Sequence, residues 1–153
     1  MKFKLSKRSL RNLDGVDERL QKVCLLAITK TKVDFGVICG LRTKEEQAEL
    51  VRKGASQTQK SKHLTGHAVD LMAYAGKRAS WEVNMYDEIA DAVKEASIEL
   101  ELDVPIRWGA AWSIDNLADW DGTAENAMNS YIDLRRSQGR RPFIDSPHFE
   151  LML

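Results

Sequence analysis

The sequence predicts an α+β fold in which a small antiparallel sheet has helices packed against one face. Helical repeats of apolar residues alternate along the chain with short stretches in which every second residue is apolar. At 153 residues, of which 43% are hydrophobic, the chain is long enough for one ordinary core and too short for two. No internal repeat, low-complexity tract or linker interrupts it. We therefore expect residues 1–153 to form a single domain.

The N-terminal third predicts a helix followed by a strand. Residues 16–30 repeat apolar side chains at helical spacing, which is typical of an amphipathic helix packed on a core. That stripe consists of Val16, Leu20, Val23, Cys24 and Ala27. The β-rich run VDFGVIC follows, and we expect it to form a strand.

A second helix is predicted next, with both of its ends marked. Thr43 and Glu46 have the spacing of a capping box, and Gly54 stands where a helix would stop. The polar stretch 54–66 is expected to be a surface loop, where functional side chains are commonly mounted. The alternating run HAVDLMAY predicts the following strand.

The C-terminal half predicts a long helix and two further strands. From Ser80, apolar residues recur at helical spacing, so we expect a helix that ends before Pro105. The run VPIRW is the next candidate strand, and the alternating run PHFELML is typical of a half-buried strand at the end of the chain. Between them no single period dominates, although residues 124–137 could be helical.

Composition argues against several classes of partner. Lys+Arg and Asp+Glu both number 23, so there is no overall basic field of the kind that gathers nucleic acid, and we expect no nucleic-acid partner. The first 12 residues are locally basic, which we interpret as a solvated segment, with contact to an anionic surface as the alternative. No stretch is apolar enough for stable membrane insertion.

The N-terminal segment indicates where the protein is made, and the spacing of the two cysteines indicates their redox state. The basic start lacks the apolar run of a signal peptide, so we expect synthesis in the cytoplasm. We also expect the protein to be a monomer. Cys24 and Cys39 are not spaced as a disulfide framework. We interpret both as reduced thiols that fill the core.

Strand parity places polar side chains on one face of two predicted strands. In HAVDLM, Asp70 points to the face opposite Val69 and Leu71, and in PHFELML, His148 and Glu150 point away from the apolar residues between them. If the two strands are near neighbours, Asp70 and His148 converge. The preceding loop can then bring a further histidine, His63, over them.

Two imidazoles and one carboxylate form a typical catalytic zinc set that leaves a coordination position for water. Such a site implies hydrolysis, which also needs a nearby carboxylate to move a proton from water to the leaving amine. Asp145 and Glu150 are the candidates for that base.

The wider pattern resembles a known family. SKHLTGHAVDL matches the SxHxxGxAxD motif, and IDSPHFEL matches the terminal D/E-x-x-H motif, of the zinc metallopeptidases related to D-Ala-D-Ala carboxypeptidases and dipeptidases. GLRTKEEQ and IRWGAAW are similar to two further elements of that group, in the same order. Within it, the chain is most similar to phage L-alanyl-D-glutamate endolysins.

The resemblance implies particular roles for particular residues. It implies that His63, Asp70 and His148 bind Zn²⁺, that Asp145 is the catalytic base, and that Arg42 lies near the substrate carbonyl or carboxylate. Weaker matches, at Ser61 and Gln47, imply residues that line or support the site. Where the group usually has WGG, this chain has WGA with Ala110, so that turn could differ in shape.

The fold implied by the resemblance is that of the Hedgehog and DD-peptidase-like domains. The implied function is zinc-dependent hydrolysis of the L-Ala–D-Glu bond in peptidoglycan stem peptides by a phage endolysin, which lyses the cell wall after release through a holin-like pore. The alternatives are a D-Ala-D-Ala carboxypeptidase or dipeptidase, and a zinc-containing wall-binding module without activity.

By strand parity His67 faces away from Asp70, and we interpret it as structural. Trp108, Trp112 and Trp120 could stack on a muropeptide or pack in the core.

Overall fold

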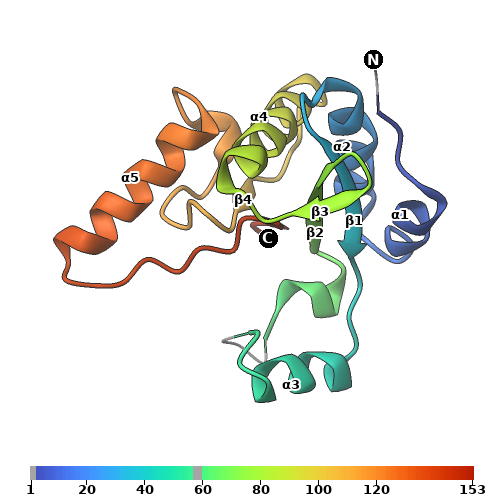
Figure 1. The fold of residues 1–153 in the computed structure, drawn as a ribbon, viewed down its shortest axis with the longest axis horizontal. Helices are drawn as coiled ribbons and strands as arrows, with labels where there is room; N and C mark the ends of the chain where they lie inside the picture. The colour runs from blue at the N-terminus through green and yellow to red at the C-terminus, as the bar shows by residue number, and fades with distance from the viewer. Residues whose placement is uncertain (1–2, 57–59) are drawn as a thin grey trace.

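The computed structural model describes residues 3–56 and 60–153. At its centre lies an antiparallel sheet with the strand order β1-β2-β5-β4, and β3 pairs with one end of β2. The strands are β1 (Asp34–Cys39), β2 (Ala68–Ala75), β3 (Arg78–Ser80), β4 (Ile106–Trp108) and β5 (His148–Leu151). The sheet joins the beginning, middle and end of the chain (Figure 1), and the predicted α+β class with a small antiparallel sheet is confirmed.

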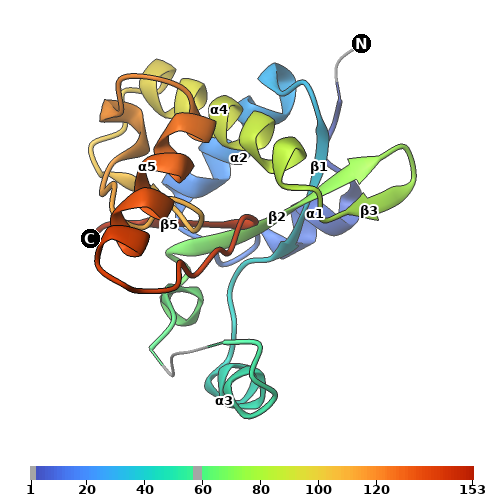
Figure 2. The ribbon, with the colours of Figure 1, turned by 60° about the vertical axis from the view of Figure 1, so that its left-hand side comes forward.

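Three helices cover one face of this sheet, as Figure 2 shows. They are α2 (Glu18–Lys30), α4 (Val83–Glu99) and α5 (Ala124–Ser137). Their apolar stripes and the inward side chains of the strands form one core cluster. The helices expected at 16–30 and 124–137 are therefore present, and α2 begins at Glu18 because the Asp17 side chain caps it.

The helix expected from Ser80 begins three residues later, at Val83. The reason is a tight hairpin: Gly76 has a φ of +64°, which glycine adopts without steric cost, and this turns the chain so that β3 pairs back onto β2. Ser80 ends that strand. The apolar helical repeat did not reveal the hairpin, because a strand of three residues is too short to show a period.

Beyond the end of β1 and the start of β2, at the bottom of Figure 1, lie α3 (Lys44–Arg52) and the short 3-10 helix η1 (Lys62–Thr65). The predicted capping box is present: Thr43 Oγ1 accepts from Glu46 N, and the Glu46 carboxylate accepts from Thr43 N. Within the expected loop at 54–66, residues 57–59 lie outside the described residues. The end of that loop is ordered as η1, and Ser61 caps it by accepting from His63 N.

A helix that the sequence analysis did not predict, α1 (Lys7–Asn12), lies along the outer edge of β1. Ser9 Oγ accepts from Val37 N at 2.9 Å, and Asn12 Nδ2 donates to Val37 O at 2.7 Å. These side chains therefore satisfy a backbone donor and a backbone acceptor at the free edge of the sheet. A second 3-10 helix, η2 (Leu117–Asp119), precedes α5. None of the helices described is both long and apolar enough for a membrane span.

Candidate metal centre

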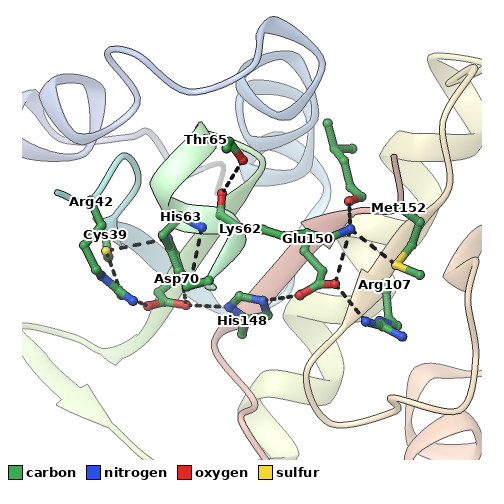
Figure 3. A network of polar contacts seen from close by, with 12 residues as sticks. Cys39, Arg42, Lys62, His63, Thr65, Asp70, Arg107, His148, Glu150 and Met152 are labelled. Carbon is green, nitrogen blue, oxygen red and sulfur yellow. Dashed lines mark hydrogen bonds and ion pairs between the residues drawn. The ribbon is translucent and has the colours of Figure 1, made fainter. Parts of the chain in front are cut away.

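The pairing of β2 with β5 brings the predicted site together. Asp70 lies opposite His148 in the register, and Ala68 lies opposite Glu150. From the far side of the cleft η1 presents His63, so that His63 Nε2 and His148 Nδ1 each lie 3.3 Å from Asp70 Oδ1 (Figure 3). The two imidazole rings are 5.1 Å apart and approach edge to face.

Hydrogen bonds on the far side of each ring select which nitrogen faces Asp70. His63 Nδ1 lies 2.8 Å from Gly40 O, and His148 Nε2 lies 2.7 Å from Glu150 Oε1. A carbonyl and a carboxylate can only accept, so both of these nitrogens carry a hydrogen. In neutral rings, His63 Nε2 and His148 Nδ1 therefore present lone pairs toward the same carboxylate oxygen.

Lone pairs on the two neutral rings and the Asp70 carboxylate would repel one another. A positive charge between the two histidines and Asp70 is therefore needed. Burial would lower the pKa of His63, but its contacts with Asp70 and Cys39 raise it to about 10. Burial would likewise lower the pKa of His148, and Asp70 and Glu150 raise it. For Asp70, burial would raise the pKa, but the two histidines hold it well below its usual range. Protons supply the charge in these rings, and a divalent metal bound by two nitrogens and one carboxylate would supply it equally well.

Asp145 reaches the same place from the turn before β5. An oxygen of its carboxylate lies within 4.8 Å of ligand atoms of Asp70 and His148. Burial raises its pKa, as does the charge of Asp70, against the opposing influence of His148, His63 and Arg42. A carboxylate with a raised pKa is a stronger proton acceptor, which is the property that a general base needs.

The backbone of Gly109 holds that turn in place. Gly109 O accepts from Asp145 N at 2.8 Å, and Gly109 N donates to His148 O at 2.7 Å. A Cβ atom at this position would lie 2.3 Å from Asp145 O and 2.9 Å from His148 Cβ, so no side chain fits. The neighbouring Ala110, which replaces the usual second glycine, is fully buried, and both backbone hydrogen bonds of Gly109 form beside it.

Arg42 lies on the other side of Asp70. Its guanidinium is 3.5 Å from Asp70 Oδ2, donates to Gln47 Oε1 at 2.6 Å, and approaches Cys39 Sγ at 3.1 Å. Gln47 is fully buried and donates to Ser56 Oγ, so α3 holds this arginine in position.

The two thiols differ from each other. Cys24 is buried in the core as expected, and burial raises its pKa to about 12. For Cys39 the expectation of core filling was wrong. It ends β1 half-buried in the site, with Sγ 3.7 Å from His63 Nδ1, because the strand bulges between Val37 and Cys39 and the simple inward-outward alternation breaks there.

Glu150, considered above as an alternative base, is 5% exposed and lies behind His148 rather than beside Asp145. Its second oxygen accepts from Arg107 NH2 at 2.9 Å. Burial would raise its pKa, but His148 and Arg107 lower it to about 2. Arg107 was not among the predicted site residues, although strand parity in β4 was a usable signal: its neighbours Ile106 and Trp108 point into the core.

These groups line an open cleft of about 620 Å³ between the α3–η1 side and the segment that leads into β5. Trp112 packs against His148 at 5.5 Å and against Phe143 at 6.3 Å, and both aromatic residues line the cleft. Among the other residues considered above, Trp108 is buried in the core and stacks on Phe149. His67 bonds to Thr65 and approaches Asp17, away from Asp70.

Comparison with known proteins identifies the family. The model of the phage L-alanyl-D-glutamate peptidase family matches residues 1–152. The chain is 32% identical to the L-alanyl-D-glutamate peptidase of Escherichia phage T5, over 99% of this chain and 100% of that protein. A peptidase of the same name from Listeria phage A118 is 38% identical over 50% of this chain and 26% of the phage protein.

A solved structure agrees with the sequence comparisons. The crystal structure of the L-Ala D-Glu endopeptidase ChiX of Serratia marcescens superimposes with a TM-score of 0.71 and 34% sequence identity, covering 99% of this chain and 91% of that one. The family match spans nearly the whole chain, including all the residues of the cleft. The chain therefore belongs to the phage L-alanyl-D-glutamate peptidase family.

Proposed function

We propose that this chain hydrolyses the L-Ala–D-Glu bond of peptidoglycan stem peptides, with Zn²⁺ held by His63, Asp70 and His148. The observation that carries the proposal is the convergence of two imidazole nitrogens on one carboxylate oxygen in an open cleft. Two nitrogens and one oxygen from the protein are the usual ligands of catalytic zinc, and they leave a position for water. Family membership supports the same substrate class.

Asp145 is proposed as the general base. Bound zinc would lower the pKa of a water molecule toward ~7 and polarise the scissile carbonyl. The Asp145 carboxylate, beside Asp70 and His148, would accept a proton from the attacking water and pass it to the leaving amine. Its raised pKa suits both transfers, because a stronger base accepts the proton readily and the resulting acid lies nearer the working pH.

Arg42 is proposed to bind the substrate carbonyl or a nearby carboxylate. Its positively charged guanidinium is held by Gln47 and Asp70. A fixed positive charge at this place favours the negative charge that develops on the carbonyl oxygen as water attacks. Trp112 and Phe143, which form the opposite wall, offer apolar surface to the peptide.

For the biological setting we propose that residues 1–153 are a single catalytic domain that acts as a monomer on the cell wall. We further propose that the protein is made in the host cytoplasm and reaches its substrate through a holin-like pore, because it belongs to a family of phage peptidases.

Digestion of purified peptidoglycan tests the proposed function. Wild-type protein with one equivalent of zinc should release peptides with new D-Glu N-termini, detected by mass spectrometry. The matched control, Asp145→Asn, should release almost none. Free D-Ala would instead indicate a D-Ala-D-Ala carboxypeptidase or dipeptidase, and no product from wild-type protein would indicate a zinc-containing wall-binding module.

A further inference from the structure

Glu150 lies where three polar side chains meet behind the metal-facing side of His148, as Figure 3 shows. Its Oε1 atom accepts from His148 Nε2 at 2.7 Å, and its Oε2 atom accepts from Arg107 NH2 at 2.9 Å. Lys62 Nζ approaches the same Oε2 atom at 3.7 Å. The two carboxylate oxygens therefore have separate tasks: one faces the histidine and the other faces the cations.

We propose that Glu150, held in place by Arg107, is a positioning residue that keeps the hydrogen of His148 on Nε2 and so leaves Nδ1 open toward the metal. This inference builds on the proposed zinc site, because it concerns one of its ligands. The position of the hydrogen on His148, however, can be measured in the absence of metal.

The chemistry of a carboxylate explains why glutamate is required. A carboxylate has no hydrogen to donate, so the histidine nitrogen that faces it must be the donor. An amide of the same shape has one acceptor and one donor end. Arg107 and Lys62 can only donate, so the amide oxygen of a glutamine would turn toward them and its NH₂ group toward His148. Nε2 would then have to accept, and the hydrogen would move to Nδ1.

Arg107 is suited to hold Glu150 because it is itself held from two sides. Its guanidinium lies 5.1 Å from the centre of the Trp112 ring, and Trp112 packs against His148. On its outer side, NH1 lies 3.9 Å from Asp115, whose side chain is 80% exposed. Asp115 therefore shares a neighbour with Glu150 without contributing to the buried chain of contacts, which makes it a matched control.

Zinc affinity, measured by competition with a chromophoric chelator, gives the first test. Glu150→Gln should weaken binding by about 10- to 100-fold, the usual effect of losing a group that orients a metal ligand. Asp115→Asn should bind zinc as tightly as wild type. If Glu150→Gln lowers only the melting temperature and leaves the zinc dissociation constant unchanged, Glu150 is merely structural and the proposal is wrong.

A double variant separates positioning from general loss of packing. With Arg107→Met in the background, the glutamine at position 150 is freed from its strongest competing donor and can offer its oxygen to His148. The double variant should therefore bind zinc more tightly than Glu150→Gln alone, which is a coupling that independent sites do not show. Losses that simply add would contradict the proposal.

Nitrogen-15 NMR of the imidazole rings gives a test without metal or activity. At a pH where His148 is neutral, the metal-free wild type should carry its hydrogen on Nε2, and Glu150→Gln should carry it on Nδ1. A wild-type hydrogen on Nδ1 would overturn the proposal. If wild type binds no zinc at all, the proposed function fails, and the NMR result still decides the role of Glu150.

Discussion

At the scale of single residues, His63 and His67 lie four positions apart yet have different surroundings. His63 faces Asp70, whereas His67 bonds to Thr65 beside Asp17. We expect His67→Gln to retain about one zinc per chain and His63→Gln to lose it, as measured by metal analysis after gel filtration. Retention by His63→Gln together with loss by His67→Gln would mean that the proposed ligand is the wrong histidine.

Asp145 and His148 are three residues apart, and substitutions at the two positions should have different effects on zinc binding and activity. His148→Ala should lose zinc and activity together, because a proposed ligand is gone. Asp145→Asn keeps the shape of the side chain but cannot accept a proton, so zinc should remain while kcat falls by roughly 10²- to 10⁴-fold. Zinc content and kcat measured on the same preparations distinguish the two. An active Asp145→Asn enzyme would assign the base to another group.

The pH dependence of metal binding follows from the raised pKa values of His63 and His148. Both rings must lose a proton to bind zinc, so affinity and activity should fall in mild acid and continue to rise well above pH 7. Titrations with a chelator at several pH values measure this. A dissociation constant that is flat from pH 6 to 9, with the chelator's own protonation corrected, would contradict it.

The stability of the metal-free protein should show the opposite trend at high pH. Because the pKa of His63 is raised to about 10, its contribution to folding is fully present below the unfolded value of about 6.5 and is lost as pH rises through 10. For Asp70 the folded pKa is lowered, so its contribution is present above about 3.9 and is lost in stronger acid. Thermal unfolding of the chelated protein should therefore give a higher melting temperature at pH 5.5 than at pH 10.

At the scale of elements, the backbone hydrogen bonds that join the end of β4 to the turn before β5 depend on Gly109. Gly109→Ala places a Cβ atom against Asp145 O, and relieving that overlap should cost about 1–3 kcal/mol of stability. It should also displace Asp145 and His148, so zinc content and activity should both fall. Ala110→Gly, which restores the usual second glycine, is the control and should keep both. Normal zinc content in Gly109→Ala would show that zinc binding does not depend on this close approach of Gly109 to Asp145 and His148.

The elements that could be predicted from the sequence are those with a clear period. The alternation in HAVDLM and PHFELML predicted that Asp70 and His148 share a face, and the register confirms that they lie opposite each other. His63 was placed near them from its position in the preceding loop, and Asp145 was one of two candidate bases. The resemblance to the family decided between the two bases, since no periodicity applies to a loop or to a turn containing Pro147. Arg107 and Cys39 were missed because their roles depend on which strands are neighbours and on a bulge, neither of which the local sequence specifies.

At the scale of the whole molecule, the proposed zinc ligands come from parts of the chain that are distant in sequence. His63 belongs to η1, Asp70 to β2, and His148 to the last strand. A metal that binds only the folded chain stabilises it by mass action, by about 2.7 kcal/mol when its free concentration is 100 times the dissociation constant. Among the described helices, α3 and η1 carry residues that line the cleft. Chelation should therefore destabilise this side more than the helices on the other face.

The side chains that α1 places along β1 have a consequence for how the protein behaves at high concentration. An uncovered strand edge recruits another strand, and two copies joined in this way can extend into aggregates. Ser9 and Asn12 occupy the hydrogen-bonding groups of Val37 at that edge. A chain lacking residues 1–12 should therefore self-associate as its concentration rises, which light scattering would detect, whereas charge-reversed Lys7→Glu, with its edge still covered, should stay monodisperse. The basic N-terminal segment, which the sequence suggests is a solvated tail, would then allow the protein to accumulate without aggregating.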